Sequence, residues 1–213
     1  MKILIIICSK FPNPYLYESI NKLYNIQIKN NSDYKICIVD SDSNDITNYT
    51  KIQNKFPEVD ICLCKNINYE YGAWKYGYTK YPDYDIYICL QDTTIIYKQI
   101  DISKVNDQTV YNFINISGFY SHPNIKELGI RMLKDSPLDY PKIIDTRFML
   151  SQHNIFVVNN NIMKDIFDNL TIAPIDKNGS CSYERLFGIY FILKNINCIP
   201  LGNYINKVHG KRI

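Results

Sequence analysis

The sequence predicts a single α/β domain with a mostly parallel, Rossmann-like central sheet flanked by helices. Short apolar runs rich in β-branched residues alternate with segments whose apolar residues recur at helical spacing, which is typical of parallel βαβ units. The chain has 213 residues, 46% of them apolar, which is enough for one large core. No linker, internal repeat or low-complexity segment divides it. We therefore expect residues 1–213 to form one domain.

The alternation is clearest in residues 1–98. Predicted strands cover residues 3–8, 35–39, 59–64 and 86–90, and predicted helices cover 15–28, 46–56 and 71–81. The second strand stops abruptly in an acid and hydroxyl cluster at residues 40–45. Because ligands in open α/β sheets bind at the carboxyl ends of the strands, we expect this half to be a nucleotide-binding layer.

Residues 99–213 are less regular. Predicted strands cover residues 110–119, 155–158 and 196–201, and predicted helices cover 124–133, 162–170 and 183–193. The stretch 135–145 contains Pro137 and Pro141 and is expected to be a surface loop that carries substrate contacts.

Charge and cysteine content exclude several classes of protein. The 24 basic and 21 acidic residues are mixed along the chain, so we expect no nucleic-acid partner. The apolar run 3–8 is too short for a signal peptide or a membrane span, and we expect a cytoplasmic protein. The seven cysteines lie mostly in predicted strands and should be free thiols. Cys62 and Cys64 have no second pair or nearby His to complete a zinc site.

A single carboxylate follows the fourth predicted strand. The run 86–90 is apolar and should be covered on both faces, so Asp92 just beyond it must meet solvent, a metal or a ligand. Alternatively, Asp92 caps a turn through its side chain, which is common for Asp before a Thr pair. The strand alone does not decide between a ligand site and a turn.

Three segments, taken in order, carry a resemblance to a known family. They are VDSDSNDIT at residues 39–47, the stretch 66–94 with its Asn, Gly-Ala pair, helix and strand, and the stretch 154–188 with SYERLFG at its end. Together they resemble the GT-A fold glycosyltransferases. The chain also looks like the small glycosyltransferase domain of large DNA viruses that helps to glycosylate the major capsid protein. The resemblance implies a nucleotide-sugar-binding half, residues 1–98, and an acceptor-binding half, residues 99–213.

In this family an acidic motif at the end of the fourth strand binds a divalent cation, Mn²⁺ or Mg²⁺. The resemblance therefore implies that Asp92 is a metal ligand and acts in catalysis. The family usually has two acids flanking one residue here, whereas this chain has Gln91 before Asp92 and Thr93 after it. His209 matches a position where some members supply a late metal ligand, and a His would favour Mn²⁺. The alternative for His209 is a solvated histidine near the end of the chain.

The resemblance also implies a set of residues around the nucleotide sugar. A carboxylate at a strand end can accept hydrogen bonds from a ribose diol or from uracil, so we expect Asp40, Asp42 or both to do this. Asp45 is better explained by an Asx turn with helix capping. The full expected set is Cys8, Ser9, Lys10, Asp40, Asp42, Asn68, Gly72 and Gln91.

Glu184 matches the family's catalytic acid, expected at the start of a helix. A general base there would take the proton from the acceptor hydroxyl during an inverting transfer. In a retaining transfer, Glu184 would instead orient the acceptor. As an ordinary first-turn acid it would only be stabilised by the helix dipole.

These expectations describe a metal-dependent glycosyltransferase. It would transfer a sugar from a nucleotide-diphosphate sugar, UDP-linked, to a glycan or glycoprotein acceptor. One alternative is a catalytically silent nucleotide- or sugar-binding module. In this alternative the site, with Gln91 in place of the first acid of the motif, no longer binds a metal. Another is a sugar-nucleotide hydrolase or a nucleotidyltransferase; the latter usually carries a glycine-rich phosphate loop after the first strand, and residues 8–12 lack the glycines.

Overall fold

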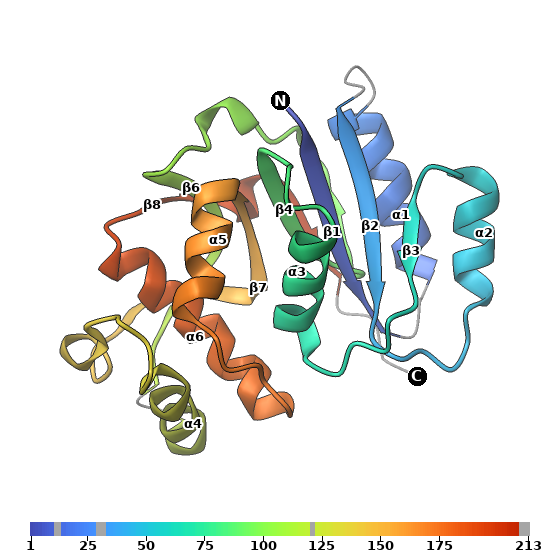
Figure 1. The fold of residues 1–213 in the computed structure, drawn as a ribbon. Coiled ribbons are helices and arrows are strands. Elements are labelled where there is room, and N and C mark those ends of the chain that lie inside the picture. Colours follow the sequence, from blue (N-terminus) through green and yellow to red (C-terminus); the bar gives the residue numbers. More distant parts are fainter. Residues whose placement is uncertain (11–13, 29–32, 120–121, 209–213) are drawn as a thin grey trace.

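The computed structural model describes residues 1–10, 14–28, 33–119 and 122–208. Its centre is a seven-stranded sheet with the strand order β3-β2-β1-β4-β7-β6-β8 (Figure 1). The strands are β1 Ile3–Ser9, β2 Tyr34–Asp40, β3 Asp60–Cys62, β4 Ile86–Gln91, β6 Thr109–Ser117, β7 Phe148–Asn159 and β8 Asn197–Pro200. Only β7 runs antiparallel to its neighbours β4 and β6. The mostly parallel α/β sheet predicted from the sequence is confirmed.

Helices cover both faces of this sheet. On one face lie α1 Pro14–Leu23, continued by the π-helix η1 Tyr24–Ile28, and α2 Thr47–Lys55; on the other lie α3 Tyr69–Lys80, α4 Pro123–Leu133, α5 Asn160–Asn169 and α6 Lys177–Leu193. Figure 1 shows α3 in front of the sheet and α1 behind it. None of the helices in the described part of the chain is long and apolar enough to cross a membrane.

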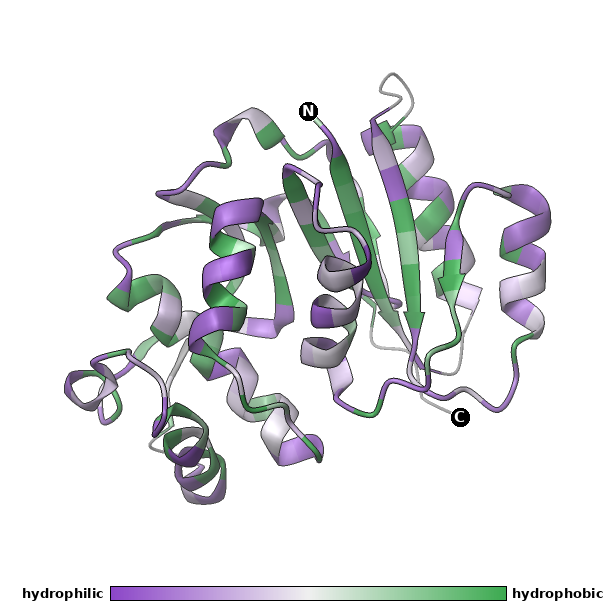
Figure 2. Cartoon of the chain, viewed as in Figure 1, coloured by the Kyte–Doolittle hydropathy of each residue, from purple (hydrophilic) through white to green (hydrophobic). Residues whose placement is uncertain are grey.

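The alternation of side chains along the strands explains the two layers. In β1, Ile3, Ile5 and Ile7 pack with α1 and α2, while Leu4, Ile6 and Cys8 pack with the α3 side. Both faces of the strand are therefore buried, as expected for a parallel sheet covered by helices on both sides. Figure 2 shows this as green central strands between helices of mixed colour.

A small antiparallel ribbon was not predicted. It pairs β5 Thr94–Ile96 with β9 Ile205–Lys207. Beside it, the backbone N–H of Val208 donates to the carbonyl of Thr93 at 2.9 Å, and the Lys207 ammonium bonds the Thr93 hydroxyl. The end of the described chain therefore holds the turn that follows Asp92. The remaining short elements are the 3-10 helices η2 Ile102–Lys104, η3 Tyr140–Lys142 and η4 Leu201–Asn203.

Two elements begin at least six residues earlier than the sequence predicts. Strand β7 starts at Phe148 rather than near residue 155, and it is interrupted by His153 and Asn154, whose φ angles of 56° and 58° are left-handed. Helix α6 starts at Lys177 rather than at Tyr183, because the Asp176 side chain caps it by accepting from the N–H of Gly179 at 2.7 Å.

The earlier start of α6 changes the setting of Glu184. The expectation that Glu184 stands at a helix start is wrong: it lies seven residues after Lys177, in the interior of the helix. The preceding residues Gly179, Ser180 and Ser182 are poor helix formers, but all three are buried. Tertiary packing therefore overrides their low helix propensity.

Candidate functional site at the carboxyl ends of β1, β2 and β4

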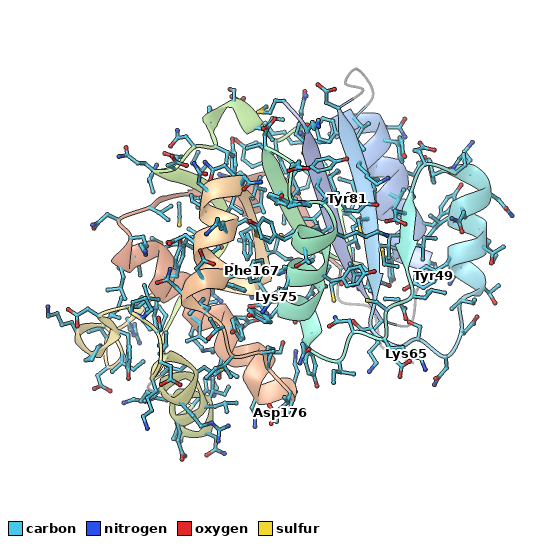
Figure 3. All side chains as sticks on the ribbon, viewed as in Figure 1. Tyr49, Lys65, Lys75, Tyr81, Phe167 and Asp176 are labelled. Carbon is cyan, nitrogen blue, oxygen red and sulfur yellow. The ribbon has the colours of Figure 1, made fainter. Side chains whose placement is uncertain are left out.

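A pocket of about 190 Å³ lies where β1, β2 and β4 end. The backbone ties these ends together: the Ser41 N–H donates to the Ser9 carbonyl at 2.8 Å, and the Asp92 N–H donates to the Cys8 carbonyl at 3.0 Å. Figure 3 labels Lys65 and Asp176, which directly precede the lining residues Asn66 and Lys177 in the sequence. Both labels lie at the edge of the sheet toward which the β1 and β2 arrows point. The lining residues are Cys8, Lys10, Ser41, Asp42, Asn66, Ile67, Tyr69, Glu70, Gln91, Asp92 and Lys177.

Five of the predicted donor-site residues therefore meet in one place. They are Cys8, Lys10, Asp42, Gln91 and Asp92. Lys10 and Lys177 bring two ammonium groups from opposite sides of the fold to the same pocket. A pocket with lysines and carboxylates suits a diphosphate, either paired directly with the lysines or bridged to a carboxylate by a cation.

Asp92 lies at the buried end of this pocket and is only 8% exposed. Its Oδ2 accepts hydrogen bonds from the Ser9 hydroxyl and the Lys10 N–H, both at 3.3 Å. Mg²⁺ needs few protein carboxylates, because it keeps several waters and takes further oxygens from substrate phosphates. The donor set of this pocket fits such a cation, for which the Asp92 carboxylate would be the protein ligand.

The described residues include one tighter group of metal-capable side chains, Cys37, Asp60 and Cys62, and none of them lines the pocket. The Lys80 ammonium donates to Asp60 at 2.6 Å and to the Cys62 sulfur at 3.2 Å. The pKa of the Cys62 thiol is lowered to about 7. The hydrogen bond from the Cys37 thiol has the larger lowering effect, and that from the Lys80 ammonium the smaller. The Lys80 ammonium therefore already pairs with this group, and none of its three residues contributes to the pocket at the strand ends.

Three acids, Asp40, Asp42 and Asp45, lie at or just after the end of β2 and have different surroundings. Asp40 is 3% exposed and its carboxylate accepts from the Ser43 N–H and hydroxyl and from the Tyr49 hydroxyl, so it holds the loop together. Asp42 has a left-handed φ of 62°, is exposed and lines the pocket. Asp45 accepts from the Thr47 N–H at 2.8 Å, and its hydrogen bonds to Thr47 lower its pKa. The Asx turn expected at Asp45 is confirmed, but the expected helix cap is not, because the N-cap residue of α2 is Ile46 and no side chain caps it.

Asn68 and Gly72 shape the loop before α3 rather than line the pocket. The Asn66 side chain accepts from the Asn68 N–H at 3.0 Å and donates to the Tyr69 carbonyl at 2.7 Å. A Cβ on Gly72 would lie 2.1 Å from Asn66 Oδ1, so only glycine allows α3 to approach this loop. Asn68 also donates to the Pro174 carbonyl at 2.8 Å, and this bond links the loop to the segment that precedes α6.

Glu70 is a pocket residue that sequence reasoning missed. It lies in the first turn of α3, is 6% exposed, and accepts hydrogen bonds from Gln91, Ser180 and Asn154. These partners lie on β4, α6 and β7, so no local sequence pattern could reveal them. Burial first, and then the negative charge of Glu70, raise the pKa of the neighbouring Cys8 thiol, which keeps that thiol neutral.

Glu184 lies beside the pocket but is not among its lining residues. Its Oε1 accepts from the backbone N–H of His153 at 2.8 Å, and its Oε2 bonds Arg185 at 3.0 Å. Burial is the largest influence on its pKa and raises it, against the lowering effect of the His153 N–H and of Arg185. His209, the other expected metal ligand, lies outside the described residues.

Comparison with known proteins places this fold. No protein-family model and no curated protein sequence matches the chain. Among solved structures, S. aureus TarS residues 1–349 in complex with UDP matches with a TM-score of 0.57 at 17% identity, over 96% of this chain and 60% of that one. The mannosyltransferase PcManGT from Pyrobaculum calidifontis, in complex with GDP-Man and Mn²⁺, matches with a TM-score of 0.51 at 10% identity, over 93% of this chain and 54% of that one.

The chain thus spans about three fifths or less of the length of these structures. The two comparisons cover 96% and 93% of this chain, respectively. At these identities the likeness establishes architecture. The chain has the fold of the GT-A glycosyltransferases.

Proposed function

We propose that this chain transfers a sugar from a nucleotide-diphosphate sugar, UDP-linked, to a glycan or glycoprotein acceptor. The observation that carries the proposal is the pocket at the carboxyl ends of β1, β2 and β4, where Lys10, Asp42, Asp92 and Lys177 meet. Two solved structures with this fold hold UDP, or GDP-Man with Mn²⁺, respectively. Within this proposal, residues 1–98 bind the donor and residues 99–213 the acceptor. The viral resemblance narrows the proposed acceptor to a capsid protein.

The donor is proposed to lie with its nucleoside at the β2 end and its diphosphate toward Asp92. Asp42 is exposed in the pocket and would bind the ribose or the base, while Asp40 would act indirectly by fixing the loop. Lys10 and Lys177 are placed to neutralise phosphate oxygens. A Mn²⁺ or Mg²⁺ ion, when bound at Asp92, would supply further positive charge to the departing diphosphate.

Glu184 is the proposed general base. Its carboxylate is fixed by the His153 N–H, and burial raises its pKa above the ordinary value of a glutamate, which makes it a stronger base. It would take the proton from the acceptor hydroxyl as this attacks the donor sugar. His153 and Asn154 connect it to the pocket, because Asn154 also donates to Glu70.

Calorimetry with UDP, with and without Mn²⁺, tests the proposal. We expect UDP to bind more tightly with Mn²⁺, and Asp92→Asn to remove most of this gain, since the variant loses the carboxylate proposed to hold the cation. Asp168→Asn is the matched control, because Asp168 is exposed on α5 and pairs only with Lys164 among the described residues. Equal UDP affinity with and without Mn²⁺ in the wild type would favour a silent binding module, which the presence of Gln91 before Asp92 also favours.

A further inference from the structure

Gln91 and Glu70 form a pair at the wall of the pocket. The Gln91 amide donates to Oε1 of Glu70, and both side chains line the pocket beside Asp92. Gln91 belongs to β4 and Glu70 to α3, so the pair joins the sheet to the helix that covers it. The residue before Asp92 is therefore neutral, yet it lies against a carboxylate.

The negative charge of Glu70 is buried among neutral donors. Its Oε2 accepts from the Ser180 hydroxyl at 2.8 Å and from the Asn154 amide at 3.4 Å. Among the described residues, no Lys or Arg lies within ion-pair distance of it. A buried carboxylate without a cation is costly, and neutral hydrogen bonds offset only part of that cost.

Two acceptor atoms around Glu70 have spare capacity. Oε1 accepts from Gln91 alone within the described part of the chain, although a carboxylate oxygen has room for two partners. Asn154, 1% exposed, donates to Glu70, but its own Oδ1 is buried with no hydrogen-bond partner among the described residues. Because Glu70 itself lines the pocket, this electron-rich group matches a positively charged or hydrogen-donating ligand there.

We propose that Glu70 supplies the negative charge that Gln91 lacks, and that it acts with Asp92 on the divalent cation that accompanies the donor diphosphate. This inference rests on the proposed function. Because Mg²⁺ keeps several of its waters in protein sites, we place Glu70 at the cation's hydration shell, where it acts through water. Glu70 is thus a positioning residue for the cation, while Asp92 is its direct ligand.

The proposal also explains why position 91 is not acidic. A glutamate or aspartate there would place a second carboxylate against Glu70 at hydrogen-bond distance, and two like charges so close cannot both remain ionised. With Glu70 on α3 and the Gln91 amide on β4, this wall of the pocket keeps one negative charge. The amide also donates a hydrogen bond to that charge. The two positions are therefore coupled, and exchanging them should preserve the site.

The test is Mn²⁺ titration of the UDP complex by calorimetry, with bound Mn²⁺ followed in parallel by electron paramagnetic resonance. We expect Glu70→Gln to lower Mn²⁺ affinity about 10–100-fold, the usual effect of losing an outer-shell partner. Gln91→Glu alone should lower the melting temperature, whereas the double variant Glu70→Gln/Gln91→Glu should recover most of the Mn²⁺ affinity. Ser180→Ala is the matched control, because it removes a hydrogen bond to Glu70 but keeps the charge.

The outcomes separate this inference from the proposed function. If the wild type binds no UDP with or without Mn²⁺, the proposed function fails and the inference fails with it. If UDP and Mn²⁺ bind normally to a well-folded Glu70→Gln variant, only the inference is overturned. If Glu70→Gln weakens UDP equally with and without Mn²⁺, Glu70 contacts the nucleotide sugar rather than the cation, and the inference is again overturned.

Discussion

The carboxylate of Glu184 accepts a hydrogen bond from the backbone N–H of His153, 2.8 Å away, at the point where β7 is interrupted by left-handed residues. This contact joins the interior of α6 to β7, the strand that lies between β4 and β6 in the sheet. A carboxylate held in this way keeps one orientation, and its position is set by the backbone rather than by a flexible side chain.

Replacing Glu184 with Gln separates a catalytic role from a structural one. Glutamine can still accept from the His153 N–H but cannot take a proton, so turnover should fall by about 10²–10⁴ while UDP affinity stays unchanged. Transfer rate, UDP affinity and melting temperature are measured on the same preparation. Near-normal turnover with a lowered melting temperature would remove Glu184 as the base.

The raised pKa of Glu184 predicts two pH dependences. A base must be deprotonated, so kcat/KM should fall as the pH drops through a pKa above the ordinary 4.5 of a glutamate. The folded protein also binds this proton more tightly than the unfolded chain does, so Glu184 lowers the free energy of unfolding as the pH rises from 4.5 through the raised pKa. Urea unfolding across this range should show the wild type losing stability relative to Glu184→Gln. Parallel curves would show that its proton affinity does not change on folding.

Asp42 and Asp45 should respond differently to the same substitution. Asp42→Asn preserves a side chain that tolerates the left-handed backbone, but it loses the charge in the pocket, so UDP binding should weaken by about 1.5–3 kcal/mol. Asp45→Asn should leave UDP binding intact and lower the melting temperature. Because its hydrogen bonds depress the pKa of Asp45, this stabilisation should be present near neutral pH and disappear as the pH falls through that lowered pKa. If calorimetry and thermal melts instead showed that Asp45→Asn weakens UDP binding and Asp42→Asn lowers only the melting temperature, the assignment of Asp42 to the nucleotide would be wrong.

Gly72→Ala should destabilise the domain by about 1–3 kcal/mol, the range for overpacking. The new methyl group would meet Asn66 Oδ1 at 2.1 Å and Asn68 Cβ at 2.7 Å, so the pocket loop must shift. Gly202→Ala is the control, since its methyl group would make an ordinary 3.6 Å contact with Phe113. Denaturant unfolding of the two variants gives the comparison. Equal stability would show that the loop adapts at no cost.

The predicted strands are confirmed where the apolar run is continuous and mostly buried. The strands β1, β2 and β4 are the clearest cases, and the acids at the ends of β2 and β4 were found with them. The first part of β7 was missed because it reads as a mixed segment with Ser151 and Gln152. The ribbon β5/β9 was missed because each of its strands has only three residues.

The candidate site was predictable only where function lies at a strand end. Asp92 and Asp42 follow strands, so their position in the chain places them at the ligand edge. Glu70 lies in an ordinary first helical turn, where an acid is expected for reasons of the helix dipole alone. Its importance comes from Gln91, Asn154 and Ser180, which only the folded chain brings to it.

The hydrogen bond between Val208 and Thr93 ties the turn that follows Asp92 to the last described residues of the chain. Strands β1, β2 and β4, which end at Ser9, Asp40 and Gln91, leave the ribosome well before residues 205–208, and domains generally begin to fold from the amino-terminal side during synthesis. A nascent chain in which residues 205–208 have not yet emerged therefore lacks the β9 and Val208 contacts that hold this turn at the edge of the pocket.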